Sequence, residues 1–460
     1  MVIRSCSSFT AIVKSMPHIA RMKPSFSDPV WQNSNLRESQ RVARKIRSGA
    51  YCYFVFVGIS YLRSRLSHGT KANHARSGIY RSIEEKPMAE MGTSAVWHDA
   101  DKSWEMRDLP LPELEADAIQ IRVKATSVCG SDLHIWRGDG IPEGAPPRDP
   151  FVFGHEMMGE VAALGNKVTT DSLRRPLKEG DRVAYSYFFP CARCYNCLRG
   201  EFGACKFRSG RKTLDEWPVC NGGFAQYYYL RSPNYVFKLP DSISNAAAAP
   251  INCALAQVYE AMHLGGVRLG DNVVVQGAGG LGVNATAVAR ELGAAKVIVI
   301  DGQKHRLDLA LQCGATHTID MNDYDTPESR IERVMELTNG IGADKVIEVV
   351  GFPAVVEEGL KMVRMRGTYL EVGHISPNSI AQIDVQQMVS NQIRFYGIQH
   401  YDPWIIPNAI DFLERTADEY PLTSVVSHEF PLDQIGKAFE TAEWLGTQSG
   451  SEVTRAVITP

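Results

Sequence analysis

Four of the ten cysteines in this 460-residue chain lie within one stretch of fifteen residues, CARCYNCLRGEFGAC. Cysteines three positions apart can turn their sulfur atoms toward a common centre, and four thiolates suit tetrahedral Zn²⁺. Disulfides are the alternative, but they are disfavoured because the chain shows no secretory signal. We predict a closed structural zinc site, with no coordination position left for a substrate, formed by Cys191, Cys194, Cys197 and Cys205.

A second group of residues with metal-binding or acid–base chemistry is scattered over three segments. A catalytic zinc needs three protein ligands and one open position. Each residue also has an ordinary structural interpretation: Cys253 as a small buried hydrophobe, His155 as a hydrogen-bonded core imidazole, and His134 as an exposed turn residue. The group consists of Cys129, Ser131, Asp132 and His134 in SVCGSDLHIW, His155 and Glu156 in FVFGHEMMGEV, and Cys253 in PINCALAQVY.

A glycine-rich loop follows a predicted strand in VVVQGAGGLGVNATAVARELGA. Gly277, Gly279 and Gly282 have the order G-x-G-x-x-G, and an amphipathic helix begins at the loop. These glycines permit a tight turn, close approach of a pyrophosphate to the backbone, and close packing of the helix on the strand. The free N–H groups at the helix start favour phosphate. We predict a dinucleotide-binding loop that includes Gly280 and Leu281.

The next predicted strand, KVIVID, ends in Asp301, twenty-four residues after Gly277. A carboxylate at this place accepts hydrogen bonds from ribose hydroxyls and repels a 2′-phosphate, which favours NAD over NADP. Arg306, five residues further on, could reach the same ribose or a phosphate. The structural interpretations are a solvated acid at a strand end for Asp301 and a charge on a helix surface for Arg306.

Elements of two kinds must position these residues. From Thr93 to about Pro240, short runs such as AIQIRVKATSV and DRVAYSY alternate apolar and polar residues, which predicts an antiparallel, partly barrel-like β domain. The Ala-rich segment ISNAAAAPINCALAQVYEAMHL predicts a helix. Val- and Ile-rich runs then alternate with helices, which predicts an α/β fold with a parallel sheet covered on both faces. Segments after Gly397 would complete the first domain.

The order of these motifs resembles that of the zinc-dependent medium-chain alcohol dehydrogenases. The resemblance covers residue 93 to the end and rests on CGSDLH, GHE, the four-cysteine lobe (residues 191–205), INCA, GAGGLG and VID. It implies a GroES-like β-barrel catalytic domain and a doubly wound Rossmann domain with a cleft between them. The expected boundaries are an N-terminal extension at 1–90, the catalytic domain at 91–254, the NAD-binding domain at 255–397, and a return to the catalytic domain at 398–460.

The resemblance also implies roles for the scattered residues. Cys129, His155 and Cys253 would bind the catalytic zinc, with Asp132 and Glu156 close behind them and Glu156 as an outer or transient ligand. Family members that act on polyols or threonine often have Glu where this chain has Cys253. That difference favours the alcohol dehydrogenase type.

We therefore predict an enzyme with two zinc ions per subunit that transfers a hydride reversibly between a primary or secondary alcohol and NAD. Ser131 would take the alcohol proton, which would pass through the nicotinamide ribose to His134 and solvent. A polyol, threonine or another functionalised alcohol is the alternative substrate, although no charged anchor for a carboxylate or phosphate stands out. An inactive zinc-stabilised binding protein and a zinc-free quinone reductase are competing hypotheses. By resemblance we expect a homo-oligomer, either a tetramer or a dimer.

Charge divides the chain into two parts. Residues 1–87 carry 15 Lys and Arg but only 4 Asp and Glu, a net charge of +11, which leaves −14 for the remainder. The acidic net charge of residues 88–460 disfavours a nucleic-acid partner, because phosphate binding needs a basic surface. The basic start resembles a transit peptide, and the apolar run AYCYFVFVGISYL is shorter than the roughly 20 residues that span a bilayer. We predict a largely disordered or targeting extension on a cytoplasmic protein, with mitochondrial import as the alternative.

Overall fold

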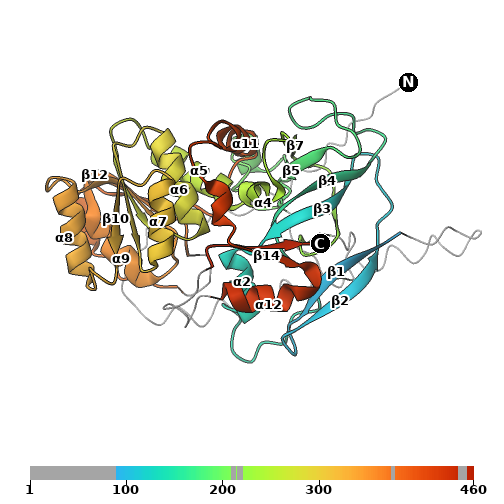
Figure 1. Cartoon of the computed structure of the whole chain (residues 1–460), viewed down its shortest axis with the longest axis horizontal. Helices are drawn as coiled ribbons and strands as arrows, with labels where there is room; N and C mark the ends of the chain where they lie inside the picture. Colours follow the sequence, from blue (N-terminus) through green and yellow to red (C-terminus); the bar gives the residue numbers. More distant parts are fainter. Residues whose placement is uncertain (1–89, 209–213, 215–220, 375–378, 444–452) are drawn as a thin grey trace, which may run out of the picture. The chain divides into compact units, whose positions relative to one another are not determined.

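The computed structural model describes residues 90–208, 214, 221–374, 379–443 and 453–460 (Figure 1). The N-terminal extension predicted at 1–90 falls outside these residues except for its last residue.

A seven-stranded sheet forms the frame of the half that is predicted to be catalytic, called the catalytic half below. The strands run in the order β14-β15-β3-β4-β5-β7, and β6 also pairs with β3. All neighbours are antiparallel except β14 and β15. The C-terminal strand β15 therefore pairs with β3, which lies near the start of the described residues. The strands are β3 (Ile119–Ser127), β4 (Glu156–Leu164), β5 (Arg182–Tyr185), β6 (Tyr227–Leu230), β7 (Val236–Lys238), β14 (His428–Pro431) and β15 (Ala456–Thr459).

A two-stranded antiparallel ribbon, β1 (Met91–His98) with β2 (Ser103–Pro110), accompanies this sheet. Trp104 of β2 packs with Phe153, Phe224 and Phe439, with ring centroids 5.1 to 6.4 Å apart. Phe439 belongs to α12, so this cluster joins the ribbon to the C-terminal helix. The short helices of this half are α2 (Gly130–Arg137), α3 (Tyr195–Leu198), η3 (Leu432–Gln434) and α12 (Ile435–Ala442).

Six parallel strands form the half that is predicted to bind a dinucleotide, called the nucleotide-binding half below. Their order is β10-β9-β8-β11-β12-β13, and every neighbouring pair is parallel. The order reverses between β8 and β11, the place where open α/β sheets bind ligands. The strands are β8 (Asn272–Gln276), β9 (Lys296–Asp301), β10 (His317–Asp320), β11 (Ala343–Glu348), β12 (Val363–Glu371) and β13 (Arg394–Gly397).

Helices connect these strands, and Figure 1 shows α6, α7, α8 and α9 beside the parallel sheet. The Val and Ile residues of β8, β9 and β11 are buried, as expected for a sheet covered on both faces. Sequence-local signals start the helices: Thr326 caps α8 by accepting from the Ser329 N–H, and Pro327 occupies the first turn. The helices are α6 (Gly280–Glu291), α7 (Lys304–Gln312), α8 (Pro327–Leu337), α9 (Pro353–Met362), α10 (Val385–Ser390) and α11 (Ile405–Arg415), with the 3₁₀ turn η2 (Leu422–Val425). The predicted fold class, a doubly wound parallel sheet with a β-rich catalytic domain, is confirmed.

The Ala-rich segment departs from its prediction as one helix. It consists of three pieces, α4 (Asn245–Ala248), η1 (Ala249–Asn252) and α5 (Ala254–Gly265). Pro250 has no N–H to donate within a helix, so it interrupts the hydrogen-bond ladder. The Asn252 side chain donates to the Tyr185 carbonyl, and the Asn252 carbonyl accepts from the Tyr401 hydroxyl. Cys253 therefore lies at a backbone break with φ −138° and ψ −81°, just before α5.

Two surface properties complete the description. At the edge of the parallel sheet, all four residues of β13 are exposed, unlike those of the central strands. Among the described residues, no helix combines the length and apolar character that crossing a bilayer requires.

Candidate active site

Four candidate metal-binding side chains meet at one point of the catalytic half. Cys129, His155, Glu156 and Cys253 each offer a ligand atom, and these atoms lie within 4.8 Å of one another. Cys129 follows β3, and Glu156 begins β4. Ser127 pairs directly opposite Glu156 in the antiparallel ladder, so strand register brings these two ends together. The break before α5 supplies Cys253.

Asp132 orients two members of this cluster. Its side chain is fully buried, and one carboxylate oxygen accepts from the Cys129 N–H at 3.0 Å. The other oxygen is 3.2 Å from His155 Nδ1. A proton on Nδ1 therefore leaves the lone pair of Nε2 available, and Nε2 is also 3.2 Å from the Ser131 hydroxyl. The ring is thus held in the orientation that a metal ligand requires.

The electrostatics of the cluster favour metal binding by a thiolate. A hydrogen bond from the Cys253 thiol, supported by His155, holds the pKa of Cys129 well below its ordinary value although burial opposes this shift. The same hydrogen bond, together with burial, raises the pKa of Cys253 well above its ordinary value. Burial works against a charged His155, but the Asp132 carboxylate outweighs it and raises the pKa of His155 to about 10. Metal binding must therefore release protons.

Arg455 is a residue of this site that the sequence patterns did not reveal. Its buried guanidinium pairs with Glu156, which also accepts from the Ser127 hydroxyl. On its other side the guanidinium contacts the glycine-rich loop, since a Cβ atom on Gly280 would overlap it. Arg455 and Glu156 are 299 positions apart, so no local spacing joins them. The residue links the metal cluster to the nucleotide loop.

The glycine-rich loop has the backbone that its sequence predicts. Gly277 has φ +98°, a conformation that favours glycine. A Cβ on Gly282 would overlap the Gly277 carbonyl oxygen, so this position requires close backbone approach. Asp301 faces the loop: one carboxylate oxygen accepts from the Ala278 N–H at 2.7 Å, and the other accepts from the Gln303 N–H at 2.8 Å. Arg306 donates to the Val453 carbonyl at 2.7 Å, which ties this edge to the C-terminal segment.

One cavity of about 700 Å³ brings the two groups together. Asp132, Glu156 and Gly282 are buried behind its wall. The predicted residues that line it are Cys129, Ser131, His134, His155 and Cys253 from the catalytic half, and Gly277, Gly279, Gly280, Leu281, Asp301 and Arg306 from the nucleotide-binding half.

His134 lines the cavity on α2. Its Nδ1 is 2.7 Å from an Asp139 carboxylate oxygen and 3.1 Å from the Arg137 guanidinium. The Ser131 hydroxyl contacts His155, as described above. The remainder of the proton route predicted between Ser131 and His134 would include the cofactor.

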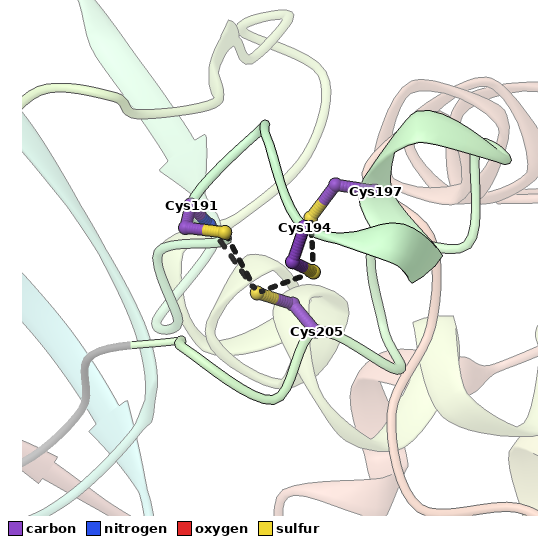
Figure 2. A group of neighbouring side chains, drawn as sticks. All are labelled: Cys191, Cys194, Cys197 and Cys205. Carbon is purple, nitrogen blue, oxygen red and sulfur yellow. Dashed lines mark hydrogen bonds between the residues drawn. The ribbon is translucent and has the colours of Figure 1, made fainter. Parts of the chain in front are cut away.

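The four-cysteine lobe forms a separate cluster (Figure 2). Figure 2 shows the four sulfur atoms turned toward one another. Cys194 Sγ is 3.5 Å from Cys197 Sγ and 3.8 Å from Cys205 Sγ, which in turn is 3.6 Å from Cys191 Sγ. All four cysteines are free thiols in this structure, and none lines the cavity. Four sulfurs at these separations suit tetrahedral zinc.

A third cluster was not anticipated from the sequence. Glu348, Glu371 and His374 lie at the carboxyl ends of β11 and β12. His374 Nδ1 is 2.9 Å from Glu371 and 3.4 Å from Glu348. Glu348 also accepts from the Gly351 N–H at 2.7 Å. Sequence spacing could not have found this cluster, because parallel strands that pair in the sheet are separated along the chain by a helix.

Comparison with known proteins agrees with this geometry. Residues 115–241 match the family described as an alcohol dehydrogenase GroES-like domain, and residues 280–415 match the family described as a zinc-binding dehydrogenase. Sorbitol dehydrogenase of Bacillus subtilis is 32% identical over 349 residues, which cover 76% of this chain and 93% of that protein. The chain belongs to the zinc-dependent medium-chain alcohol dehydrogenase family.

Two further relatives show the range of this family. L-threonine 3-dehydrogenase of Bacillus licheniformis is 34% identical over 346 residues, or 72% of this chain and 90% of that protein. The crystal structure of an alcohol dehydrogenase from Thermotoga maritima matches with a TM-score of 0.72 and 27% identity, covering 81% of this chain and all of that one. The predicted family, enzyme class and cofactors, zinc and a nicotinamide dinucleotide, are therefore confirmed. The relatives include polyol and threonine types, which the presence of Cys253 had disfavoured.

Proposed function

We propose that this enzyme oxidises a primary or secondary alcohol at Cys129, His155 and Cys253, with NAD as the hydride acceptor. The single observation that supports this site is the cavity shared by these three side chains and the glycine-rich loop. A polyol or another functionalised alcohol remains the alternative substrate, because sorbitol and threonine dehydrogenases are among the relatives.

The donor atoms fit a catalytic zinc. Two sulfurs and one imidazole nitrogen are a suitable ligand set, and the open side of the cluster faces the cavity. When bound, zinc acts as a Lewis acid that favours deprotonation of an alcohol and polarises a carbonyl. Asp132 holds the His155 ring, while Glu156 and Arg455 form a buried ion pair behind the cluster. The four-cysteine lobe would hold the second, structural zinc.

Ser131 and His134 would move the proton. The Ser131 hydroxyl lies beside His155 at the cavity wall, where it can accept a hydrogen bond from a substrate hydroxyl. His134 is held by Asp139 at a more outward position on the same helix. An imidazole there can pass a proton to solvent. Purified enzyme should contain two zinc ions per subunit and reduce NAD with members of a panel of primary, secondary, cyclic and polyol alcohols. A zinc content of one or none would contradict the assignment of two sites.

Asp301 would select NAD over NADP. Each of its carboxylate oxygens already accepts one backbone N–H, and each retains a lone pair for a ribose hydroxyl. Asp301→Asn should reduce the ratio of kcat/KM for NAD to that for NADP by about tenfold, because it removes the charge that repels a 2′-phosphate. Asp308→Asn on α7, where Asp308 pairs with Lys304, is the control. An unchanged ratio in Asp301→Asn would contradict the proposed role.

The enzyme would act as a homo-oligomer. Phe395 and Tyr396 on the edge strand β13 are 38% and 42% exposed, and an exposed edge with apolar side chains favours pairing with a second copy. Light scattering should give a multiple of the 50.9 kDa subunit mass, and Phe395→Lys should lower it. A wild-type monomer would refute this proposal.

A cytoplasmic location is proposed, with mitochondrial import as the alternative. The basic composition of residues 1–87 is the reason for the alternative, because it resembles that of a transit peptide. Cell fractionation of the full chain and of a variant that lacks residues 1–87 tests it. Mitochondrial recovery of the full chain alone would establish import instead.

A further inference from the structure

A cation lines the substrate side of the cavity at a place that the sequence did not single out. Arg208 shares the cavity wall with Cys129, His155 and Cys253. It follows the last cysteine of the four-cysteine lobe by three residues, and its guanidinium donates to the Cys205 carbonyl at 3.1 Å. The lobe therefore holds the guanidinium through one N–H group, while the side chain stays exposed.

The lobe is itself fixed against the wall of the cavity. The Gly203 N–H donates to the Asp402 carboxylate at 2.9 Å. A Cβ atom on Gly203 would be 3.0 Å from the Tyr401 carbonyl oxygen, so the two segments are in close contact. The adjacent residue, His400, lines the same cavity as Arg208. The lobe thus positions Arg208 next to the part of the cavity wall that contains His400.

The side chains beside Arg208 are polar but uncharged. Burial, with Arg208 and His155 as smaller causes, lowers the pKa of His400 to about 4. The Tyr187 hydroxyl is 3.3 Å from His400 Nδ1. Phe188 stacks on the other face of this wall, 5.1 Å from the His400 ring centroid. These groups can accept or donate hydrogen bonds but do not neutralise a cation.

Of the three other arginines that line the cavity, Arg306 belongs to the nucleotide-binding half and donates to the Val453 carbonyl, and the other two are paired with acids. Arg148 forms an ion pair with Asp99 at 2.8 Å, and Arg455 pairs with Glu156. Within residues 90–208, 214, 221–374, 379–443 and 453–460, Arg208 forms no such pair. Its charge is therefore available to a ligand in the cavity.

We infer that Arg208 is a specificity-determining residue that binds a carboxylate or phosphate carried by the alcohol substrate. A guanidinium matches the geometry of both anions and forms paired, charge-assisted hydrogen bonds with them. This inference rests on the proposed function, because it concerns the substrate of that same site. It replaces the expectation that no charged anchor is present.

The test compares matched neutral and anionic alcohols with the zinc-loaded enzyme and NAD. The pairs are 1,3-butanediol with 3-hydroxybutyrate, and sorbitol with sorbitol 6-phosphate, so that the two arms separate a carboxylate from a phosphate. At least one anionic member should have the higher kcat/KM, and added NaCl should raise its KM. Arg208→Gln should lower that kcat/KM by about 10- to 100-fold, mainly through KM, and should leave the neutral partner within about twofold. Arg208→Lys should retain part of the preference.

Arg199→Gln is the matched control, since Arg199 is an exposed arginine of the same lobe that pairs with Glu201. Zinc content and thermal unfolding verify that each variant is folded. Equal losses for neutral and anionic alcohols, or no preference in the wild type, would overturn the inference while the proposed function stands. Calorimetric titration of both anions into the enzyme–NADH complex measures binding without turnover. Equal binding by wild type and Arg208→Gln also overturns the inference, whereas an enzyme that oxidises no alcohol but binds an anion through Arg208 contradicts only the proposed function.

Discussion

Asp132 is the residue on which the geometry of the metal cluster depends most. It accepts the Cys129 N–H with one oxygen and faces His155 Nδ1 with the other. Replacing it by Asn keeps the shape but presents an N–H₂ group or a carbonyl oxygen in place of a charge. If the N–H₂ group faces the ring, His155 must carry its proton on Nε2, where it no longer binds metal.

Asp132→Asn should therefore weaken zinc binding at the catalytic site by about 10- to 100-fold. We expect dialysis against a mild chelator to leave about one zinc per subunit, and kcat/KM to fall in parallel. Asp171→Asn is the control, because Asp171 is also buried and accepts the Leu173 and Arg175 N–H groups in a distant loop. A variant Asp132→Asn with two retained zincs and normal activity would show that Asp132 does not position the ligand.

At the scale of elements, the turn between β8 and α6 contains glycines with two different structural roles. A side chain on Gly282 would overlap the Gly277 carbonyl, whereas nothing lies within 4 Å of a Cβ built on Gly279. Gly282 therefore serves the packing of the helix on the strand, and Gly279 serves the approach of the cofactor.

Alanine variants should separate these duties. Gly282→Ala should lower the free energy of unfolding by about 1–3 kcal/mol and weaken NADH binding, because α6 must move. Gly279→Ala should weaken NADH binding and leave unfolding nearly unchanged. Urea denaturation and NADH fluorescence titration measure the two effects. Equal stability of both variants would contradict this division.

The ends of β11 and β12 place Glu348, which is buried, beside the half-buried Glu371 and His374. Burial and the neighbouring Glu348 raise the pKa of Glu371, and a hydrogen bond with Glu348 raises the pKa of His374 to about 9. Both shifts mean that the native state binds more protons than the unfolded chain between the ordinary pKa values of 4.5 and 6.5 and the raised ones. The free energy of unfolding contributed by this group therefore falls as the pH rises through that window.

Glu371→Gln should make that fall shallower. It removes one raised carboxyl and reduces the acidic field on His374, so the free energy of unfolding should change less between pH 5 and pH 8 than in the wild type. Urea denaturation at several pH values measures it, with the exposed Glu332→Gln as the control. Parallel pH curves for wild type and Glu371→Gln would rule out this contribution.

At the scale of the whole molecule, the two proposed zinc sites have different roles, one catalytic and one structural. The cluster of Cys129 opens on the cavity, while the four-cysteine lobe is closed and contacts the segment that contains Asp402. One metal should therefore affect chemistry and the other should affect structure.

Cys129→Ala should abolish turnover and leave a folded protein with one zinc. Cys205→Ala should also leave one zinc, but it should lower the melting temperature by more than about 5 °C, because loss of a structural metal removes folding free energy. Zinc analysis, calorimetry and NADH formation distinguish the two variants. Residual turnover in Cys129→Ala would contradict a catalytic zinc at that cluster.

Several features of the fold could be predicted because they depend on neighbours in the sequence. The turn at Gly277, the acid at the end of β9 and the spacing of Cys191, Cys194 and Cys197 are each encoded within a few tens of residues. The prediction of one helix for the Ala-rich segment was wrong, because the missing N–H of Pro250 interrupts the helix that the alanines favour. The resulting break, which helix propensity does not indicate, brings Cys253 to the cluster.

Sequence alone determined the family, the α/β class and the candidate ligand types, since local spacing and motif order carry that information. Tertiary structure decided which of these residues share a cavity. It also introduced Arg455 and Arg208, whose roles depend on groups brought from distant strands and segments. Glu156 and Arg455 meet only because β15 and β4 both pair with β3 in one sheet. The two partners of a buried ion pair can come from distant parts of the sequence, so the pair can be identified only from the folded structure.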